Sequence, residues 1–245
     1  MKCKIVSILI LASLCFTGCK NDDDVVDQKR VPKSIAGANT TINFQYNANN
    51  QLVKVTDKTN DSDYSEMLFT YNTGGKLSKF VNASYLNGSV STHTYTVEYL
   101  ENNLVRVKDE DNEYVLVTLN EKGQALEFKG MDGSSIFSYD GKGNMVKMTS
   151  NAVTITASYN NDKGVVSAIN TPSWVFMLTD LDLHYYAVNN PVLINEVYQG
   201  NETAETHAQI ISYPREHIIL GYPTRMNVTT NQDGQSMSEV FNITY

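Results

Sequence analysis

The sequence predicts an all-β protein: a single curled antiparallel sheet, or a partial barrel, built from repeated β-hairpins, with one short helix around residues 172–183. Three observations predict this fold. A frame of an apolar residue, Tyr and then Asn or Asp recurs along the chain, apolar residues alternate around it, and the alternation stops once, after residue 170. Alternation with a period of two is typical of a half-buried strand.

The recurring frame consists of apolar-x-Tyr, then Asn or Asp with polar residues, then Gly or Asn, then x-apolar-x-x-apolar. It occurs, with substitutions, at residues 44–55, 69–80, 97–107, 117–128, 137–148 and 157–168. Gly and Asn tolerate the positive φ that hairpin turns require. Because a lone hairpin is barely stable in water, we expect the units to pair edge to edge in one antiparallel sheet. The connections between units are longer, which places short turns at one rim and long loops at the other.

The alternation stops between residues 171 and 186. Thr171 is placed to cap a helix with Pro172 at its first position, a favoured arrangement. The apolar residues that follow fall at helical spacing, namely Trp174, Met177, Leu178 and Leu181. We expect a short helix that plugs one end of the curled sheet, with a continued pair of strands as the alternative. Strands are expected to resume at 192–198, 204–213, 218–222, 224–230 and 236–245.

The first residues have the pattern of an export signal. A basic start is followed by an apolar run at 5–14, which is too short to cross a bilayer as a permanent helix, and then by Phe16-Thr17-Gly18-Cys19. Small residues just before Cys19 resemble the lipobox of bacterial lipoproteins. We expect residues 1–18 to be removed and Cys19 to carry lipid, which would hold the protein on a membrane. An ordinary signal peptide is the alternative.

Two further segments complete the predicted domain organisation. Residues 19–35 are polar and acidic and lack periodicity, as in a flexible linker, and residues 36–245 form the antiparallel β domain. The acidic cluster at 22–24, just behind the lipobox, resembles the surface-export signal of Bacteroides-group lipoproteins. We therefore expect a surface-exposed outer-membrane lipoprotein, with the periplasmic face as the alternative.

The hairpin frames resemble a degenerate YD-repeat. Together with the lipobox and the segments at 222–229, 233–234 and 241–245, they more closely resemble a Bacteroides-group lipoprotein family of unknown function with a porin-like fold. The resemblance implies a fold and a location, and it implies no activity. The terminal alternation of Phe241, Ile243 and Tyr245 also resembles the assembly signal of outer-membrane barrels. An integral barrel is disfavoured because each strand offers too few apolar residues for a spanning strand of about 9–11 residues.

Composition excludes several classes of function. The formal net charge is −8, and it becomes −10 when Lys2 and Lys4 leave with the signal, so nucleic acid is a poor partner. The near pairs Glu205–His207 and Glu216–His217 lack metal-ligand spacing, and the acidic loop at 109–113 lacks the glycine and closing glutamate of a calcium loop. No phosphate loop, dinucleotide fingerprint or nucleophile elbow occurs. We expect no cofactor, no metal and no enzymatic activity.

Aromatic residues outside the repeated frame are the candidate ligand-binding residues. Their faces can stack on sugar rings while neighbouring Asn and Asp bind hydroxyls, although simple packing is the alternative. The candidates are Trp174, Tyr185, Tyr186, Tyr64 and Tyr85. The leading hypothesis is a non-enzymatic, lipid-anchored envelope protein that binds a glycan or another ligand at its long-loop rim. A structural or assembly component that docks a protein partner is the alternative, and an integral barrel or an enzyme comes third.

Overall fold

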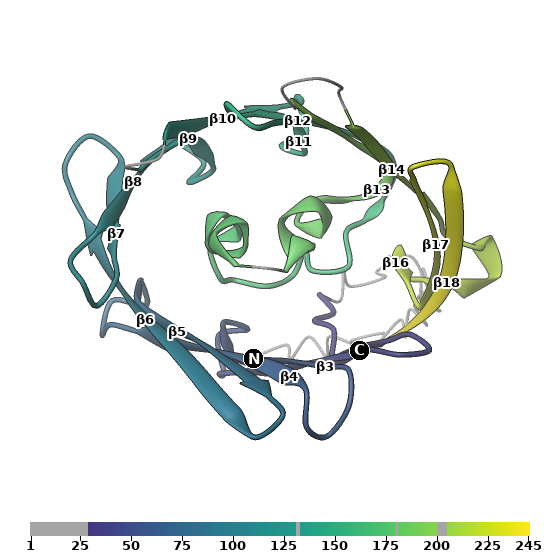
Figure 1. Ribbon diagram of the computed structural model, residues 1–245, viewed down its shortest axis with the longest axis horizontal. Coiled ribbons are helices and arrows are strands. Elements are labelled where there is room, and N and C mark those ends of the chain that lie inside the picture. Colours follow the sequence, from purple (N-terminus) through teal and green to yellow (C-terminus); the bar gives the residue numbers. More distant parts are fainter. Residues whose placement is uncertain (1–28, 131–132, 180, 200–204) are drawn as a thin grey trace, which may run out of the picture.

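The computed structural model describes residues 29–130, 133–179, 181–199 and 205–245. These residues form a closed antiparallel barrel of 16 strands that surrounds two short helices (Figure 1). Cys19, the predicted signal peptide and most of the predicted linker lie outside the described residues.

The wall consists, in chain order, of β1 (Ser34–Ala36), β2 (Thr41–Tyr46), β3 (Leu52–Lys58), β4 (Tyr64–Tyr71), β5 (Leu77–Leu86), β6 (Ser89–Tyr99), β7 (Leu104–Lys108), β8 (Tyr114–Leu119), β9 (Ala125–Gly130), β10 (Gly133–Tyr139), β11 (Met145–Thr149), β12 (Val153–Lys163), β13 (Asn189–Tyr198), β14 (Glu205–Ser212), β17 (Arg225–Gln232) and β18 (Gln235–Thr244). Inside the barrel lie the 3₁₀ helices η1 (Ser173–Leu178) and η2 (Asp182–Tyr186). The connection between β14 and β17, residues 213–224, contains η3 (Arg215–His217), β15 (Ile218–Ile219) and β16 (Tyr222–Pro223). The prediction of long loops at the rim opposite the frame turns is wrong, because the described connections there, such as 59–63, 87–88 and 109–113, have two to five residues.

The all-β antiparallel prediction is confirmed, but the predicted curled sheet or partial barrel is wrong because the sheet closes. Strand β1 pairs with β2 on one side and with β18 on the other, where Ser34 lies opposite Thr244 and Ile35 opposite Ile243. Closure leaves no free edge in the described sheet, and free edges are the part of a sheet that invites aggregation. The closing strand has three residues and spans the predicted boundary of the linker, so it is too short to show a period.

The repeated frame forms hairpins because the Asn or Asp that follows the frame's aromatic or apolar anchor holds the turn. The side chain of Asn120 accepts hydrogen bonds from the backbone N–H groups of Lys122 (2.9 Å) and Gln124 (3.0 Å). Asn47 and Asn72 accept corresponding bonds in their own turns. Such local side-chain bonds compete with extended structure and favour a chain reversal.

Tyrosine hydroxyls fasten neighbouring segments of the wall to one another. Six of them donate to backbone carbonyls at distances of 2.7–3.1 Å: four frame tyrosines, Tyr46 to Pro32, Tyr71 to Leu52, Tyr139 to Ala125 and Tyr159 to Met145, and two tyrosines outside the frames, Tyr213 to Pro191 and Tyr245 to Pro223. Burial raises the pKa of these hydroxyls, for example that of Tyr71 to about 12. The residues predicted to pack in the core therefore also make a repeated hydrogen bond around the barrel.

The sixth frame departs from the prediction, because the chain does not turn back at Gly164. Strand β12 ends at Lys163, and the chain then enters the barrel with Val165 and Val166 buried. The Gly164 N–H donates to the carbonyl of Val188 at 2.8 Å. A Cβ atom on Gly164 would collide with the carbonyl oxygen of Tyr186. This position therefore requires glycine for close packing.

The segment that enters the barrel forms a plug, which we define as residues 164–179 and 181–188. The predicted single helix is present as two 3₁₀ helices, η1 and η2, at the centre of the ring in Figure 1. Thr171 does not cap η1. Its hydroxyl instead accepts a hydrogen bond from the Leu52 N–H (2.8 Å) and lies 2.7 Å from the Tyr71 hydroxyl. These bonds fix the plug to the wall near the short turns.

The two faces of the wall differ in polarity. The inner face packs Leu52, Val55 and similar residues against the plug. The outer face carries ion pairs such as Glu98 with Arg106 and Lys108, both at 3.1 Å, together with exposed apolar residues such as Leu68, Ile136 and Ile210. A barrel that spans a bilayer has a continuous apolar outer band, which these ion pairs interrupt.

Among the described helices, none is long and apolar enough to span a membrane.

Candidate functional site

The interior of the barrel is filled at one end and hollow at the other. The plug packs under the short turns, where Trp174, Val175 and Phe176 are buried. Toward the rim that carries the connections 59–63, 87–88 and 109–113, two cavities remain beside the plug, and we call them together the cup. Their walls are formed by different strands, so they lie on different sides of the plug.

The larger cavity has a volume of about 880 Å³, within the range of about 300–1,000 Å³ that small-molecule sites occupy. Strands β1, β2, β3, β14, β17 and β18 wall it, and its floor is the plug around η2. Most of its lining is apolar, including Ile42, Leu183, Met226, Val228 and Phe241.

Three carboxylates face this apolar lining: Asp57 from β3, Asp182 from η2 and Glu239 from β18. Asp57 accepts a hydrogen bond from the Thr40 hydroxyl, and Glu239 accepts one from the Ala38 N–H, both at 2.9 Å. These bonds hold the two side chains at the cavity edge. The cavity is therefore shaped for a ligand with a substantial apolar part.

The smaller cavity, of about 480 Å³, lies against Tyr95, Phe128 and Leu178 and is bordered by Asp109 and Glu113. Asp109 is occupied within its own turn, because its carboxylate accepts the N–H groups of Asp111 (3.0 Å) and Glu113 (2.9 Å). The acidic loop at 109–113 is thus a self-bonded turn that forms one edge of the cup.

Charge in the cup is of one sign. Among the described residues that line the two cavities there are five carboxylates and no lysine or arginine. The basic side chains of the wall lie elsewhere, for instance Lys54, which pairs with Glu66, and Arg106. A concave site lined by charges of one sign focuses its field and attracts the opposite charge. The cup therefore favours cations.

The five aromatic candidates are not brought together. Trp174 and Tyr185 are buried in the plug, with 1% and 3% of their surface exposed. Tyr64 and Tyr85 stack on each other with ring centroids 4.2 Å apart, on the same face of the wall as Glu66. Tyr186 lines the larger cavity.

Sequence reasoning missed the carboxylates of the larger cavity. Asp57, Asp182 and Glu239 are far apart in the chain, and each looks like an ordinary polar residue beside a strand or turn. Barrel closure brings Asp57 and Glu239 to the same cavity, because β1 joins β2 to β18. The alternation of residues along β3 and β18 could have placed Asp57 and Glu239 on the inner face. It could not have predicted that the two side chains lie at the same cavity.

Comparison with known proteins finds solved structures to which the chain is similar. The chain is similar to a porin-like protein from Bacteroides uniformis, with 16% identity, a TM-score of 0.41, and coverage of 89% of this chain and 98% of that one. It is also similar to a porin-like protein from Bacteroides vulgatus, with 10% identity, a TM-score of 0.43, and coverage of 88% and 99%. No family model matches the chain, and no curated protein matches it. The resemblance to a Bacteroides-group lipoprotein family remains a prediction.

Proposed function

We propose that this protein is a non-enzymatic, lipid-anchored protein of the bacterial outer membrane whose barrel is a cup for a ligand that combines an apolar part with a positively charged group. The observation that carries the proposal is the largely apolar cavity of about 880 Å³, with the carboxylates of Asp57 and Glu239 at its edge and that of Asp182 on its floor. A cation held beside apolar surface gains both from burial of its apolar part and from the field of the carboxylates.

The anchor is the second part of the proposal. The lipobox at Cys19 supports attachment by acyl chains, and the charged outer wall supports a barrel that stays in water beside the membrane rather than within it. Mass spectrometry of the N-terminal peptide should find Cys19 acylated, and Cys19→Ser should release the protein from the membrane fraction. Protease treatment of intact cells should digest a surface-exposed protein. An unmodified Cys19 would remove the anchor from the account.

Ligand class is tested with probes of equal size and different charge. We expect calorimetry of the purified protein to detect octylamine binding at least about tenfold tighter than octanoate, a difference of about 1.4 kcal/mol. Asp57→Asn with Glu239→Gln should remove that preference. Glu127→Gln is the matched control, since its side chain also carries one negative charge but lies on the outer face, beside exposed Ile136. Equal binding of the amine and the carboxylate, or equal loss in the control, would contradict the proposed ligand class.

The sequence suggested a glycan as the ligand of this protein. A glycan array probed with the purified protein tests it directly. Binding restricted to amino sugars would agree with the acidic cup, whereas binding to acidic sugars would oppose it.

A further inference from the structure

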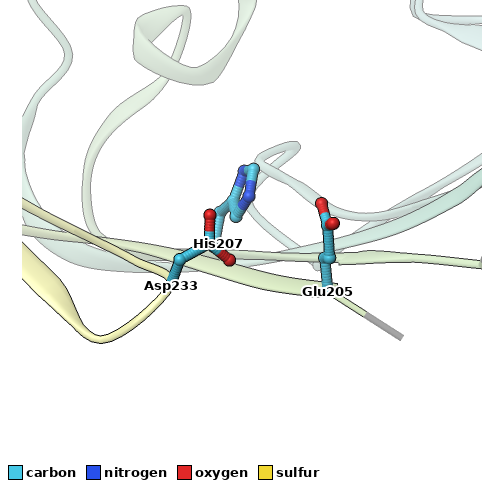
Figure 2. A group of neighbouring side chains, drawn as sticks. All are labelled: Glu205, His207 and Asp233. Carbon is cyan, nitrogen blue, oxygen red and sulfur yellow. The ribbon is translucent and has the colours of Figure 1, made fainter. Parts of the chain in front are cut away.

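Three side chains of types that can bind metal meet at the rim that carries the connections 87–88, 109–113 and 233–234. Glu205 and His207 lie two residues apart on β14 and so project from the same face, while Asp233 lies in the turn between β17 and β18. One oxygen of each carboxylate and one ring nitrogen of His207 all lie within 4.8 Å of one another (Figure 2). His207 is paired in register with Gln232, which places Asp233 beside it.

The polar contacts of His207 leave one nitrogen for a ligand. Its Nδ1 lies 3.9 Å from Oε2 of Glu196, directly opposite on β13. Its Nε2 is buried and has no hydrogen-bond partner among the described residues. Buried ring nitrogens are normally satisfied, so this atom needs a partner that protein groups do not supply.

A carboxylate behind the imidazole completes the arrangement. Glu196 accepts a hydrogen bond of 2.7 Å from the Tyr198 hydroxyl, whose pKa is raised to about 12 by that bond and by burial. The Tyr198 ring lies 5.0 Å from the His207 ring. Metal-bound histidines usually have their second nitrogen held by a carboxylate or carbonyl, which fixes the ring and strengthens the ligand. Glu196 lies 3.9 Å from Nδ1, so a shift of about 1 Å would bring it to hydrogen-bond distance for this role.

The type of donor selects the class of metal. One imidazole nitrogen with two carboxylate oxygens is a set that Zn²⁺ and neighbouring transition metals accept, and three protein ligands leave a coordination position for water or another ligand. Ca²⁺ prefers six to eight oxygen ligands, so a histidine opposes calcium. A divalent cation would also relieve the repulsion between the carboxylates of Glu205 and Asp233.

We propose that Glu205, His207 and Asp233 bind a divalent transition metal, with Zn²⁺ as the probe, and that Glu196 is a positioning residue that orients His207. The metal would join the start of β14 to the turn between β17 and β18. The proposal goes beyond the ligand-binding cup and does not depend on it, because the three side chains are distinct from the residues that line the larger cavity.

The test is isothermal titration of ZnCl₂ into the full-length, untagged, chelator-treated protein. All samples carry Cys3→Ser, Cys15→Ser and Cys19→Ser so that thiols do not bind the metal. We expect one Zn²⁺ per chain, and His207→Ala and Asp233→Asn should each weaken binding by at least about 100-fold, since loss of an outer partner alone costs about 10–100-fold. Glu196→Gln should weaken it within that smaller range.

The matched control is His93→Ala. His93 is a second rim histidine beside a carboxylate, with Nδ1 3.8 Å from Glu110, but no third ligand joins it in the described clusters. Its loss should leave the affinity unchanged.

Co²⁺ substitution should give the visible absorption of a four-coordinate site in the parent and in Glu196→Gln, and not in His207→Ala. The proposal is overturned if the parent binds Zn²⁺ no more tightly than Asp233→Asn, if His93→Ala weakens binding as much as His207→Ala, or if Ca²⁺ binds as tightly as Zn²⁺. Circular dichroism of the metal-free variants should match that of the parent, which separates ligand loss from misfolding.

Discussion

The repeated tyrosine hydrogen bond predicts the result of removing a single oxygen atom. In Tyr139→Phe the ring stays, so no cavity forms, but the carbonyl of Ala125 loses the hydroxyl that donates to it at 2.8 Å. Ala125 is fully buried, so its carbonyl has little access to replacement water. Leaving a buried acceptor unsatisfied costs about 1–3 kcal/mol.

The repetition makes this prediction sharper. Tyr46, on β2 and far around the barrel from Tyr139 on β10, makes the corresponding bond to Pro32 at 2.7 Å. We expect Tyr46→Phe to cost a similar amount, and the double variant to cost the sum within about 0.5 kcal/mol, because distant sites without shared partners are additive. For a chain of this length, each kcal/mol corresponds to a fall of about 2–4 °C in Tm.

The assay is urea unfolding at pH 7, followed by circular dichroism and tyrosine fluorescence. Tyr64→Phe is the control, because the Tyr64 ring stacks on Tyr85 on the outer wall, and its cost should stay below about 0.5 kcal/mol. If Tyr46→Phe and Tyr139→Phe cost no more than the control, the hydroxyls do not fasten the hairpins and the reasoning fails.

Four further changes test other parts of the fold. Asp140→Ala should destabilise by about 1–2 kcal/mol because three turn N–H groups lose their acceptor, while Asp140→Asn, which restores the residue type found in the sister turns, should unfold within about 0.5 kcal/mol of the parent. Trp174→Ala should cost about 3–5 kcal/mol in urea unfolding through a cavity in the plug, and a smaller loss would mean that the plug repacks. Gly164→Ala should cost at least about 1–3 kcal/mol by collision with a backbone carbonyl, and unchanged stability would contradict the close approach. Stability should fall as pH rises from 10 to about 12, because folded Tyr71 keeps its proton over that range while the unfolded chain releases it; a Tyr absorbance titration complete near pH 10 would refute this.

Local chemistry made the hairpins predictable. The Asn or Asp after each frame anchor, and the Gly or Asn that follows, specify a turn through bonds within five residues, so no distant contact is needed to recognise them. The same frame at 157–168 failed at Gly164. A glycine that permits a turn and a glycine that permits close packing are alike in sequence, and only the packing against Tyr186 distinguishes them.

Closure and the cup depended on contacts between residues far apart in the chain. The strand Ser34–Ala36 shows no usable period, yet it joins the first and last parts of the chain. Glu205 and His207 were visible as a near pair on a strand, but Asp233 reaches them only through the pairing of β14 with β17. Aromatic type alone did not separate the buried Trp174 from the stacked Tyr64, because apolar burial and ligand stacking use the same residues.

The closed barrel defines the cup, so the pairing of β1 with β18 is the point to measure. Ser34 and Thr244 lie directly opposite each other in an antiparallel pair, with their hydroxyl oxygens 2.8 Å apart. Opposite residues in such a pair have Cα atoms about 4.5–5.5 Å apart, which a disulfide can bridge. In a background without the native cysteines, Ser34→Cys with Thr244→Cys should oxidise to a cross-link found by peptide mass spectrometry. Ser34→Cys with Ser138→Cys, on the distant strand β10, should not. Failure of the first pair to cross-link in folded protein, or equal cross-linking of both pairs, would contradict a closed barrel.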